Sequence, residues 1–442
     1  MALFAREPEY ITELRDGTVK QLNPFTGTQV WTVPGRGNRP LGMVSPHPLP
    51  LRPEEMGRHC AFCELRYLET PPEKSRVIRR DDGSWETIYR NPAEELFTTV
   101  AQFRRVPNLF EILSFDYWHQ NYGFELPERV SQRKAAYLSS PAGLDHVMRV
   151  VEAKLYASGL SDDEVAEMGH DDKIARASSF FGGGHDLIVA RRHFVDNAAD
   201  DSQLASSGTL TPEEHAKFIA YTVESMKMAY EVNRYVRYVA AFQNWLKPAG
   251  ASFDHLHKQL VSIDERGTQQ EAALVRLRQN PNIFNDAAAN YATHRNLIIA
   301  ENPHAIAFAG FGHRYPTIEV YSRSVHSDPW EQHPEEVRGM SDMIHAMHVA
   351  TGADVPCNEE WHCRPIDVKH PMPWRVMLKW RVSTLAGFEG ATKIYLNTIA
   401  PTTLRDRVVG ALRTLRDEGR IAQDLKIATE ATCVPNPLRY SR

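Results

Sequence analysis

Apolar and polar residues follow one another along the chain in a pattern that occurs twice. In the first half, residues 185–193 contain a short apolar run that ends at a histidine, which predicts a buried strand. Residues 211–214 (Thr-Pro-Glu-Glu) are typical of a helix start, with a capping hydroxyl, a proline in the first turn and acidic side chains near the amino end. A strand over residues 235–242 then leads to a turn and to a short strand with two histidines.

The same order of elements returns in the second half. Residues 318–321 predict a strand, and His326 follows it as a histidine follows the first strand. Residues 333–336 (His-Pro-Glu-Glu) begin a helix, and residues 374–380 predict a strand in the place of the one with two histidines. A unit of strand, histidine, helix and strand that is used twice indicates an internal duplication.

A helical segment interrupts the first half. Apolar residues between positions 147 and 155 recur at helical spacing, and residues 161–164 (Ser-Asp-Asp-Glu) are typical of a helix start. We interpret residues 119–181, which precede a run of three glycines, as an insertion. The duplicated halves are then residues 1–268, which include this insertion, and residues 269–442.

Residues 244–259 carry the densest candidate chemistry. His255, His257 and Gln259 are spaced two apart, so on a strand their side chains point to the same face. The small residues 250–252 before them allow the backbone to approach a ligand closely, as phosphate sites require. The alternative interpretation is a half-buried strand with two structural histidines.

Composition and charge narrow the class of protein. The 442 residues are 42% hydrophobic and 24% charged, which is typical of a folded soluble protein. A net charge of −5 does not favour a nucleic-acid or membrane partner. No run of eighteen apolar residues occurs, and the amino terminus lacks the apolar core of a signal peptide. We therefore expect a cytoplasmic protein that binds neither nucleic acid nor membrane.

Two of the five cysteines, Cys60 and Cys63, form a Cys-x-x-Cys motif. Five cysteines in a chain of this length do not indicate a disulfide framework, so the motif is a metal site or a redox site. Because no second Cys-x-x-Cys exists, a metal here would need histidines from elsewhere in the chain. Arg36 and Arg39 lie on a Gly/Pro loop before the motif; they are either solvated surface or the clamp of a phosphate site.

Several of these motifs together resemble the galactose-1-phosphate uridylyltransferase family, a duplicated branch of the histidine-triad superfamily. They are Arg36, Arg39, Cys60, Cys63, His193 and residues 244–259. Residues 70–73 (Thr-Pro-Pro-Glu) are similar to the ADP-glucose phosphorylase-like members. The resemblance covers most of the chain except roughly residues 115–180. It implies an α+β, duplicated histidine-triad-like fold of antiparallel sheets flanked by helices.

The resemblance implies a two-step nucleotidyl transfer. His257 would attack the α-phosphate of a nucleotide sugar to form a covalent nucleotidyl-histidine, and a sugar phosphate or phosphate would then accept the nucleotide. Gln259 stands where the family has a phosphate-binding glutamine and histidine-triad hydrolases have a third histidine, which favours a transferase. Ser252 would be a further hydrogen-bond donor to the phosphate. The resemblance assigns substrate binding to Arg36, Arg39, Asn108, Asn244, Gly250, Phe388 and Glu389.

The resemblance also implies a zinc site with four ligands, which are Cys60, Cys63, His193 and His255. Two cysteines with two histidines form a closed tetrahedral set that is typical of structural zinc, and free thiols are the alternative. Met377 and Lys379 stand where the family has a His-x-His in the second half, so we expect that further metal site to be absent. Lys258 replaces a residue that is usually small, which leaves the identity of the substrate open.

The resulting hypothesis is a nucleotidyltransferase that moves a nucleoside monophosphate from a nucleotide sugar to a sugar phosphate or phosphate. One alternative is a phosphorylase or hydrolase of dinucleoside polyphosphates or nucleotide sugars. Another is a non-catalytic nucleotide-binding scaffold. Because the second half lacks the histidines but keeps Phe388 and Glu389, we expect a homodimer in which this segment completes the site of the partner chain.

Overall fold

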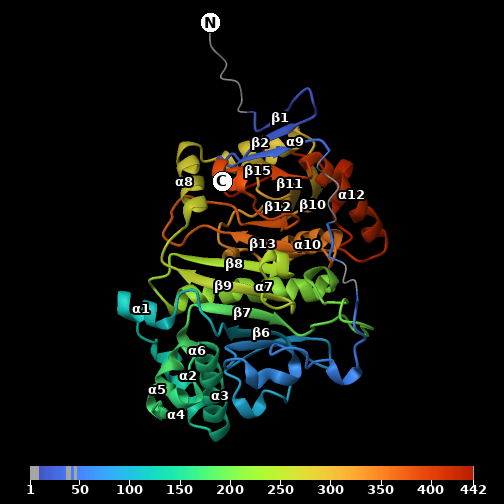
Figure 1. Ribbon diagram of the computed structural model, residues 1–442. Coiled ribbons are helices and arrows are strands. Elements are labelled where there is room, and N and C mark those ends of the chain that lie inside the picture. The colour runs from blue at the N-terminus through green and yellow to red at the C-terminus, as the bar shows by residue number, and fades with distance from the viewer. Residues whose placement is uncertain (1–8, 36–40, 44–46, 442) are drawn as a thin grey trace.

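A twelve-stranded antiparallel sheet forms the centre of the protein in the computed structural model, which describes residues 9–35, 41–43 and 47–441 (Figure 1). Its strand order is β16-β10-β11-β12-β14-β13-β8-β9-β7-β6-β4-β5. The strands, in chain order, are β4 (Ser75–Arg79), β5 (Trp85–Tyr89), β6 (Ala101–Pro107), β7 (His185–Ala190), β8 (Tyr238–Trp245), β9 (His257–Ile263), β10 (Ile298–Glu301), β11 (Ala305–Ala309), β12 (Thr317–Ser322), β13 (Cys357–His362), β14 (Arg375–Trp380) and β16 (Lys426–Ile427).

The two halves of this sheet have equivalent strand orders when each is followed from its outer edge to the centre. The first half runs β5-β4-β6-β7-β9-β8 and the second runs β16-β10-β11-β12-β14-β13, and the halves join where β8 pairs with β13. At this seam Asn244 lies opposite Asn358. The helix of each half crosses the same face of the sheet, as α7 (Pro212–Val232) and α10 (Pro334–Thr351). The predicted duplicated α+β fold is therefore confirmed.

The two helix starts predicted from the Pro-Glu-Glu motifs are confirmed in detail. The Thr211 hydroxyl accepts the backbone N–H of Glu214 at 3.2 Å, and the Glu214 carboxylate accepts the backbone N–H of Thr211 at 2.8 Å. At the start of α10, the His333 ring accepts the backbone N–H of Glu335, and the Glu336 carboxylate accepts the backbone N–H of His333. Such caps satisfy backbone N–H groups that have no partner inside the helix. The two helices pack on each other, and His215 of α7 hydrogen-bonds Ser341 of α10 at 2.7 Å.

Six helices lie between β6 and β7 and form a layer of their own at one end of the molecule (Figure 1). The apolar residues predicted at helical spacing between positions 147 and 155 are buried on the third helix, where they pack against Phe180 and Phe181. No helix in the described part of the chain is both long and apolar enough to cross a membrane. The six helices are α1 (Phe115–Tyr122), α2 (Glu128–Leu138), α3 (Pro141–Ala157), α4 (Asp162–Glu167), α5 (His170–Arg176) and α6 (Ser178–Gly182).

The amino-terminal strands belong in space to the second half. They are β1 (Ile11–Glu13), β2 (Val19–Leu22) and β3 (Gln29–Thr32), and β3 pairs in parallel with β15 (Ile394–Asn397) of the carboxy-terminal half. The hydroxyl of Tyr291 also accepts the backbone N–H groups of Tyr10 and Ile11. A boundary at residue 268 therefore separates the two repeats in sequence, but the first strands of the chain pack with the second repeat. The remaining helices of the second half are α8 (Thr268–Gln279), α9 (Asn290–His294), α11 (Gly387–Thr392) and α12 (Pro401–Asp417).

Several strand boundaries differ from the prediction. β8 continues to Trp245, so Asn244 lies within the strand, and β9 begins only at His257, so His255 precedes it. The His255 carbonyl accepts a hydrogen bond from the His257 ring and is therefore turned away from the strand ladder. β11 and β13 were not predicted. β11 is buried along its whole length and lacks alternation, and β13 is rich in polar residues whose partners come from distant segments.

Candidate active site and metal site

His257 stands at the first position of β9 with its ring buried. Its Nδ1 lies 2.7 Å from the backbone oxygen of His255. Because a carbonyl oxygen only accepts, Nδ1 carries the proton, and Nε2 keeps its lone pair. Burial lowers the pKa of His257 to about 4, and the ring of Phe62 lies 5.7 Å away, centre to centre. The structure thus holds a neutral imidazole whose free nitrogen is fixed in one tautomer.

Gln259 is held by a histidine that the sequence interpretation did not assign to the site. Oε1 of Gln259 lies 3.1 Å from Nε2 of His185, and Nδ1 of His185 accepts the backbone N–H of Ile112 at 3.3 Å. Since Nδ1 is an acceptor, Nε2 carries the proton and donates to the amide oxygen. The NH₂ group of Gln259 is therefore left free to donate to a ligand. Nδ2 of Asn108 lies 3.1 Å from the same Nε2 atom, a contact between two protonated nitrogens and not a hydrogen bond, and it brings this predicted residue into the cluster.

The register of the sheet places these side chains on one face. Leu187 of β7 pairs with Gln259, and Phe242 of β8 pairs with Gln259 on the other side. Directly paired residues share a face, and alternate residues along a strand share it too, so His185 and Asn244 lie on the same face as Gln259. The sequence showed that His185 begins a predicted buried strand. That this strand pairs with β9, and that its register brings His185 to Gln259, is seen only in the structure.

The turn between β8 and β9 is built on an unusual backbone. Gly250 has φ = 88°, a left-handed conformation that favours glycine, and Leu246 is also left-handed with φ = 65°. Asn358 from the second half braces this turn, because its amide donates to Oδ1 of Asn244 at 2.7 Å and to the carbonyl oxygen of Ala249 at 2.8 Å. Ser252 is exposed in the turn. The turn is thus fixed by both halves of the protein.

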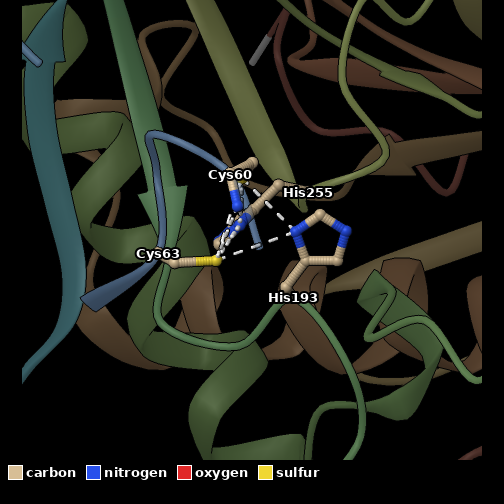
Figure 2. Close-up of side chains that lie close together, drawn as sticks. All are labelled: Cys60, Cys63, His193 and His255. Atoms are coloured by element: carbon tan, nitrogen blue, oxygen red, sulfur yellow. Dashed lines mark hydrogen bonds between the residues drawn. The ribbon is translucent and has the colours of Figure 1, made fainter. Parts of the chain in front are cut away.

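Four side chains converge on a potential metal position, as Figure 2 shows. They are the predicted ligands Cys60, Cys63, His193 and His255, and their ligand atoms all lie within 4.8 Å of one another. The two Sγ atoms are 3.8 Å apart, and the four Sγ to Nδ1 distances run from 3.3 to 3.9 Å. Tetrahedral bonds of about 2.3 Å to sulfur and about 2.05 Å to nitrogen require about 3.8 Å between sulfurs and about 3.6 Å between sulfur and nitrogen. The cluster therefore fits a single tetrahedral metal ion.

The surroundings of the cluster suit a metal site. Nε2 of His255 donates to the carbonyl oxygen of Ala190 at 2.7 Å, which leaves Nδ1 without a proton and directed at the cysteines. The hydrogen bond from the Cys60 thiol lowers the pKa of Cys63 and favours its thiolate form. Because His255 and His257 are joined through one carbonyl group, a metal held by His255 would fix the position of the neighbouring imidazole.

Two of the predicted substrate-binding residues, Phe388 and Glu389, lie away from His257 in the structure, and two others are not among the described residues. Arg36 and Arg39 fall outside the described residues. Glu389 caps its own helix α11, because Oε2 accepts the backbone N–H of Ala386 at 2.9 Å and Oε1 accepts that of Leu396 at 3.1 Å. Phe388 is 45% exposed beside β15, which Figure 1 shows near the opposite end of the molecule from β7 and β6. Within one chain, this segment is not brought to His257.

Comparisons with known proteins agree with the fold. The profile of a family described as "Domain of unknown function (DUF4921)" matches residues 14–440. The chain belongs to the DUF4921 family. This DUF4921 protein is 20% identical over 388 residues to the ADP-glucose phosphorylase of Arabidopsis thaliana, across 86% of this chain and 89% of that relative. The predicted resemblance to the ADP-glucose phosphorylase-like branch is confirmed.

Solved structures share the fold of the DUF4921 chain at low sequence identity. One is the crystal structure of an ADP-glucose phosphorylase from Arabidopsis thaliana with bound ADP-glucose; the TM-score is 0.56 at 17% identity, over 89% of this chain and 98% of that chain. Another is a GalT-like protein from the same organism, with a TM-score of 0.54 at 15% identity, over 88% of this chain and 98% of that one.

Lys258 of the DUF4921 chain points away from the candidate active site. It lies on the face opposite His257, fully buried, where Nζ contacts the Glu359 carboxylate at 2.5 Å and Oε1 of Gln243 at 3.2 Å. Glu359 is also bonded by His348 of α10 at 2.6 Å. The unusual residue between His257 and Gln259 therefore joins the two halves of the protein and does not contact the candidate catalytic face.

The second half of the DUF4921 chain has a different set of polar groups at the place that matches His257 and Gln259. Lys379 of β14 is paired with Glu360 of β13 at 2.6 Å, and Met377 precedes it on the same face. Among the described residues, the one group of side chains close enough to share a metal ion is the cysteine–histidine cluster of the first half.

Proposed function

We propose that this protein is a nucleotidyltransferase that transfers a nucleoside monophosphate from a nucleotide sugar to phosphate or to a sugar phosphate through His257. The observation that carries the proposal is the orientation of two side chains on one face of β9. His257 keeps a free Nε2 because Nδ1 donates to His255, and Gln259 keeps a free NH₂ because His185 occupies its oxygen. A nucleophile next to an amide donor is the arrangement that nucleotidyl transfer requires.

In the first step of the proposed reaction, Nε2 of His257 attacks the α-phosphorus of the nucleotide sugar. A P–N bond forms, the bond from phosphorus to the bridging oxygen breaks, and the sugar phosphate leaves with the electron pair. The imidazole becomes positively charged while Nδ1–H still donates to the His255 carbonyl, which stabilises that charge. The amide of Gln259 donates to the nonbridging oxygens, where negative charge is held.

In the second step, an oxygen of the accepting phosphate attacks the same phosphorus. The P–O bond forms and the P–N bond breaks, which restores the neutral imidazole. The turn at Gly250, with Ser252 and Asn244, is proposed to supply further donors to the phosphates. Because the proteins with similar sequence and fold include an ADP-glucose phosphorylase, an adenine nucleotide sugar with phosphate as acceptor is the first pair to test.

The four-ligand cluster is proposed to hold a structural zinc ion. Zinc with two cysteine and two histidine ligands has no open position, so it supplies folding energy and fixes its ligands in place. In this chain it would clamp the turn at Cys60 and Cys63 onto the segment that leads to His257. The residues fit the ion through the sulfur and nitrogen spacing described above.

Mass spectrometry of the intact protein tests the proposal directly. The protein is incubated with single nucleotide sugars and no acceptor, and we expect the mass of one nucleoside monophosphate to be added per chain. His257→Ala should abolish the added mass while the protein stays folded. Adduct formation in the alanine variant would show that another residue is the nucleophile. Release of free nucleotide without any adduct would instead favour hydrolysis.

A further inference from the structure

A cavity lies on the face of the sheet opposite the candidate active site. It has a volume of about 420 Å³ and is enclosed by the sheet, the carboxy end of α7, helix α2 and the glycines that follow α6. Leu260 and Ser262 of β9 line it, and so does Asp186 of β7. These residues alternate along their strands with Gln259 and His185, so one layer of sheet separates the cavity from the candidate catalytic face.

The lining of this cavity has a large excess of positive charge, and we call it the basic pocket. Among the described residues, Asp186 is the single acidic side chain of the lining, and it faces five basic ones: Lys74, Arg90, Arg105, Arg129 and Arg133. Asp186 is shared, since it pairs with Lys74 at 2.7 Å and with Arg105 at 2.6 Å. Arg90 and Arg129 are exposed, whereas Lys74, Arg105 and Arg133 are wholly or partly buried, so one buried carboxylate faces three cations that are partly removed from water.

Arg133 of α2 is the cation whose charge is least compensated. Within the described part of the chain its guanidinium donates one hydrogen bond, to the backbone oxygen of Glu73 at 2.8 Å, and lies 5.4 Å from the ring centre of Phe181. The Glu73 carboxylate is already occupied by two other arginines, Arg76 and Arg104. Burial lowers the pKa of Arg133 to about 10, so the side chain remains charged at neutral pH and is poorly solvated.

Acidic groups behind the lining do not remove this excess. Glu224 on α7 accepts the hydroxyl of Tyr89 at the edge of the pocket. The pKa of Glu111 is raised to about 7, chiefly by burial, so this side chain is only partly ionised at neutral pH. With both carboxylates counted as fully charged, the five cations still outnumber the three acids.

The other walls of the basic pocket are apolar. They are formed by Val130, Phe181, Met228, Val232 and Leu260. Glycine is required at position 183 of this wall, because a Cβ atom there would lie 2.4 Å from the backbone oxygen of Ser179. A cavity with a cluster of guanidinium and ammonium groups and a fixed apolar wall suits a ligand with an anionic end and an apolar end.

We propose that the basic pocket binds a small organic phosphate, with the phosphate on Arg133, Arg105 and Lys74 and the organic part against Phe181 and Met228. Guanidinium groups match phosphate oxygens in geometry and charge, and the aromatic ring and thioether supply the apolar contact. Helices α2 and α6 form one wall of the proposed site, which gives these helices a binding role. It does not depend on the nucleotidyltransferase activity.

Phenyl phosphate is a suitable probe because it combines a phosphate with one apolar ring. Its binding to the full-length protein is measured by calorimetry, and its location by hydrogen exchange of peptides that cover residues 128–138 and 178–184. We expect slower exchange in both peptides, and the same protection in His257→Ala, because His257 lies on the other face of the sheet. Phenol, which lacks the phosphate, should give no protection.

Charge variants decide the role of the pocket. Arg133→Gln should weaken binding of phenyl phosphate at these peptides by about tenfold or more, because a charged hydrogen-bond donor is lost. Arg149→Gln is the matched control: it removes the same charge from α3 in the same helical layer, at an exposed position paired with Asp145. Val232→Glu leaves every cation in place and adds a carboxylate to the wall, so it should also abolish binding.

The outcomes separate cleanly. Protection at residues 128–138 and 178–184 that is lost in Arg133→Gln and in Val232→Glu, and kept in Arg149→Gln, supports the site. Unchanged affinity in both pocket variants, or protection restricted to the turn of residues 246–256, overturns it. If Arg133→Gln does not fold, as judged by thermal unfolding, the Val232→Glu protein decides the question alone.

Discussion

Replacing His185 with phenylalanine removes the group that orients the amide of Gln259 while keeping a ring of similar size. In the native protein Nε2–H of His185 donates to Oε1 of Gln259 at 3.1 Å, and the ring accepts the backbone N–H of Ile112 at 3.3 Å. Without the imidazole, no hydrogen bond to Oε1 fixes the orientation in which the amide of Gln259 directs its NH₂ group to the ligand. Rotation of the amide would present its oxygen to a phosphate instead, which is repulsive.

The size of the effect follows from the contact that is lost. One hydrogen bond in a protein contributes about 0.5–1.5 kcal/mol net, so losing the bond that orients the Gln259 amide should weaken its stabilisation of the transition state by up to that amount. Formation of the nucleotidyl-His257 adduct should therefore slow by up to roughly tenfold. Gln259→Ala removes the donor itself and should cost about 100-fold or more, as loss of a transition-state hydrogen-bond donor does. The phenylalanine variant should therefore lie between the wild type and Gln259→Ala.

The assay is the rate at which nucleotide mass is added to the intact protein in single-turnover mixtures. His146→Phe is the matched control, because His146 is also buried and has two hydrogen bonds, to Tyr137 and to the backbone oxygen of Thr70, but it lies in the helical layer. His185→Gln supplies an amide donor in place of the imidazole and should recover part of the rate. If folded His185→Phe forms the adduct at the wild-type rate, His185 does not position Gln259.

Three further outcomes are expected. Cys63→Ala should reduce the metal content from one ion per chain to none by elemental analysis, and should lower the unfolding free energy by several kcal/mol, because a closed site contributes to folding; full metal occupancy in that variant would disprove the ligand assignment. The pKa of Glu111 is about 7 in the folded protein against an ordinary value of 4.5, because burial disfavours the carboxylate, so the folded state holds the proton more tightly than the unfolded one. Stability should therefore fall between pH 4.5 and 7 by up to about 3 kcal/mol, and Glu111→Gln should flatten this part of the denaturation profile; an unchanged slope would contradict it. If two chains share their sites, mixing inactive His257→Ala with Phe388→Ala under subunit exchange should restore up to one working site per mixed dimer, whereas a monomer by light scattering would exclude sharing. Phe388 is the better partner for this mixture than Glu389, because the Glu389 carboxylate holds its own helix and loss of activity there would have a local structural cause.

Features encoded by short-range spacing could be predicted from the sequence. The helix start at Thr211 depends on residues within one turn, and the cap forms as expected. The Cys60 and Cys63 spacing by itself indicates a metal site or a redox site, while the resemblance to a known family supplied the two histidines, and the structure brings all four potential ligand atoms together. The same resemblance placed Asn108 near the site, where it contacts His185.

Features that depend on pairing between distant segments could not be predicted. β13 has the sequence Cys-Asn-Glu-Glu-Trp-His, and its two acidic residues do not resemble those of a central strand. They are tolerated there because Lys258, Lys379 and His348 from other elements pair with them. The role of Lys258 was misjudged for the same reason, since the sequence shows its neighbour His257 but not the face to which each side chain points. Burial of a charge becomes acceptable only when its partner is present.

The sequence by itself determined the duplicated order of elements, the helix starts, the metal-binding residue types and the alternate spacing of His257 and Gln259, because each is set by the geometry of a single strand, turn or helix. Only the tertiary structure decided what surrounds them. The register of β7 against β9 brings His185 to Gln259, and the packing of α2 against the opposite face adds Arg129 and Arg133 to the basic side chains near Asp186. Both outcomes are contacts across more than fifty residues of chain, and no local pattern specifies them.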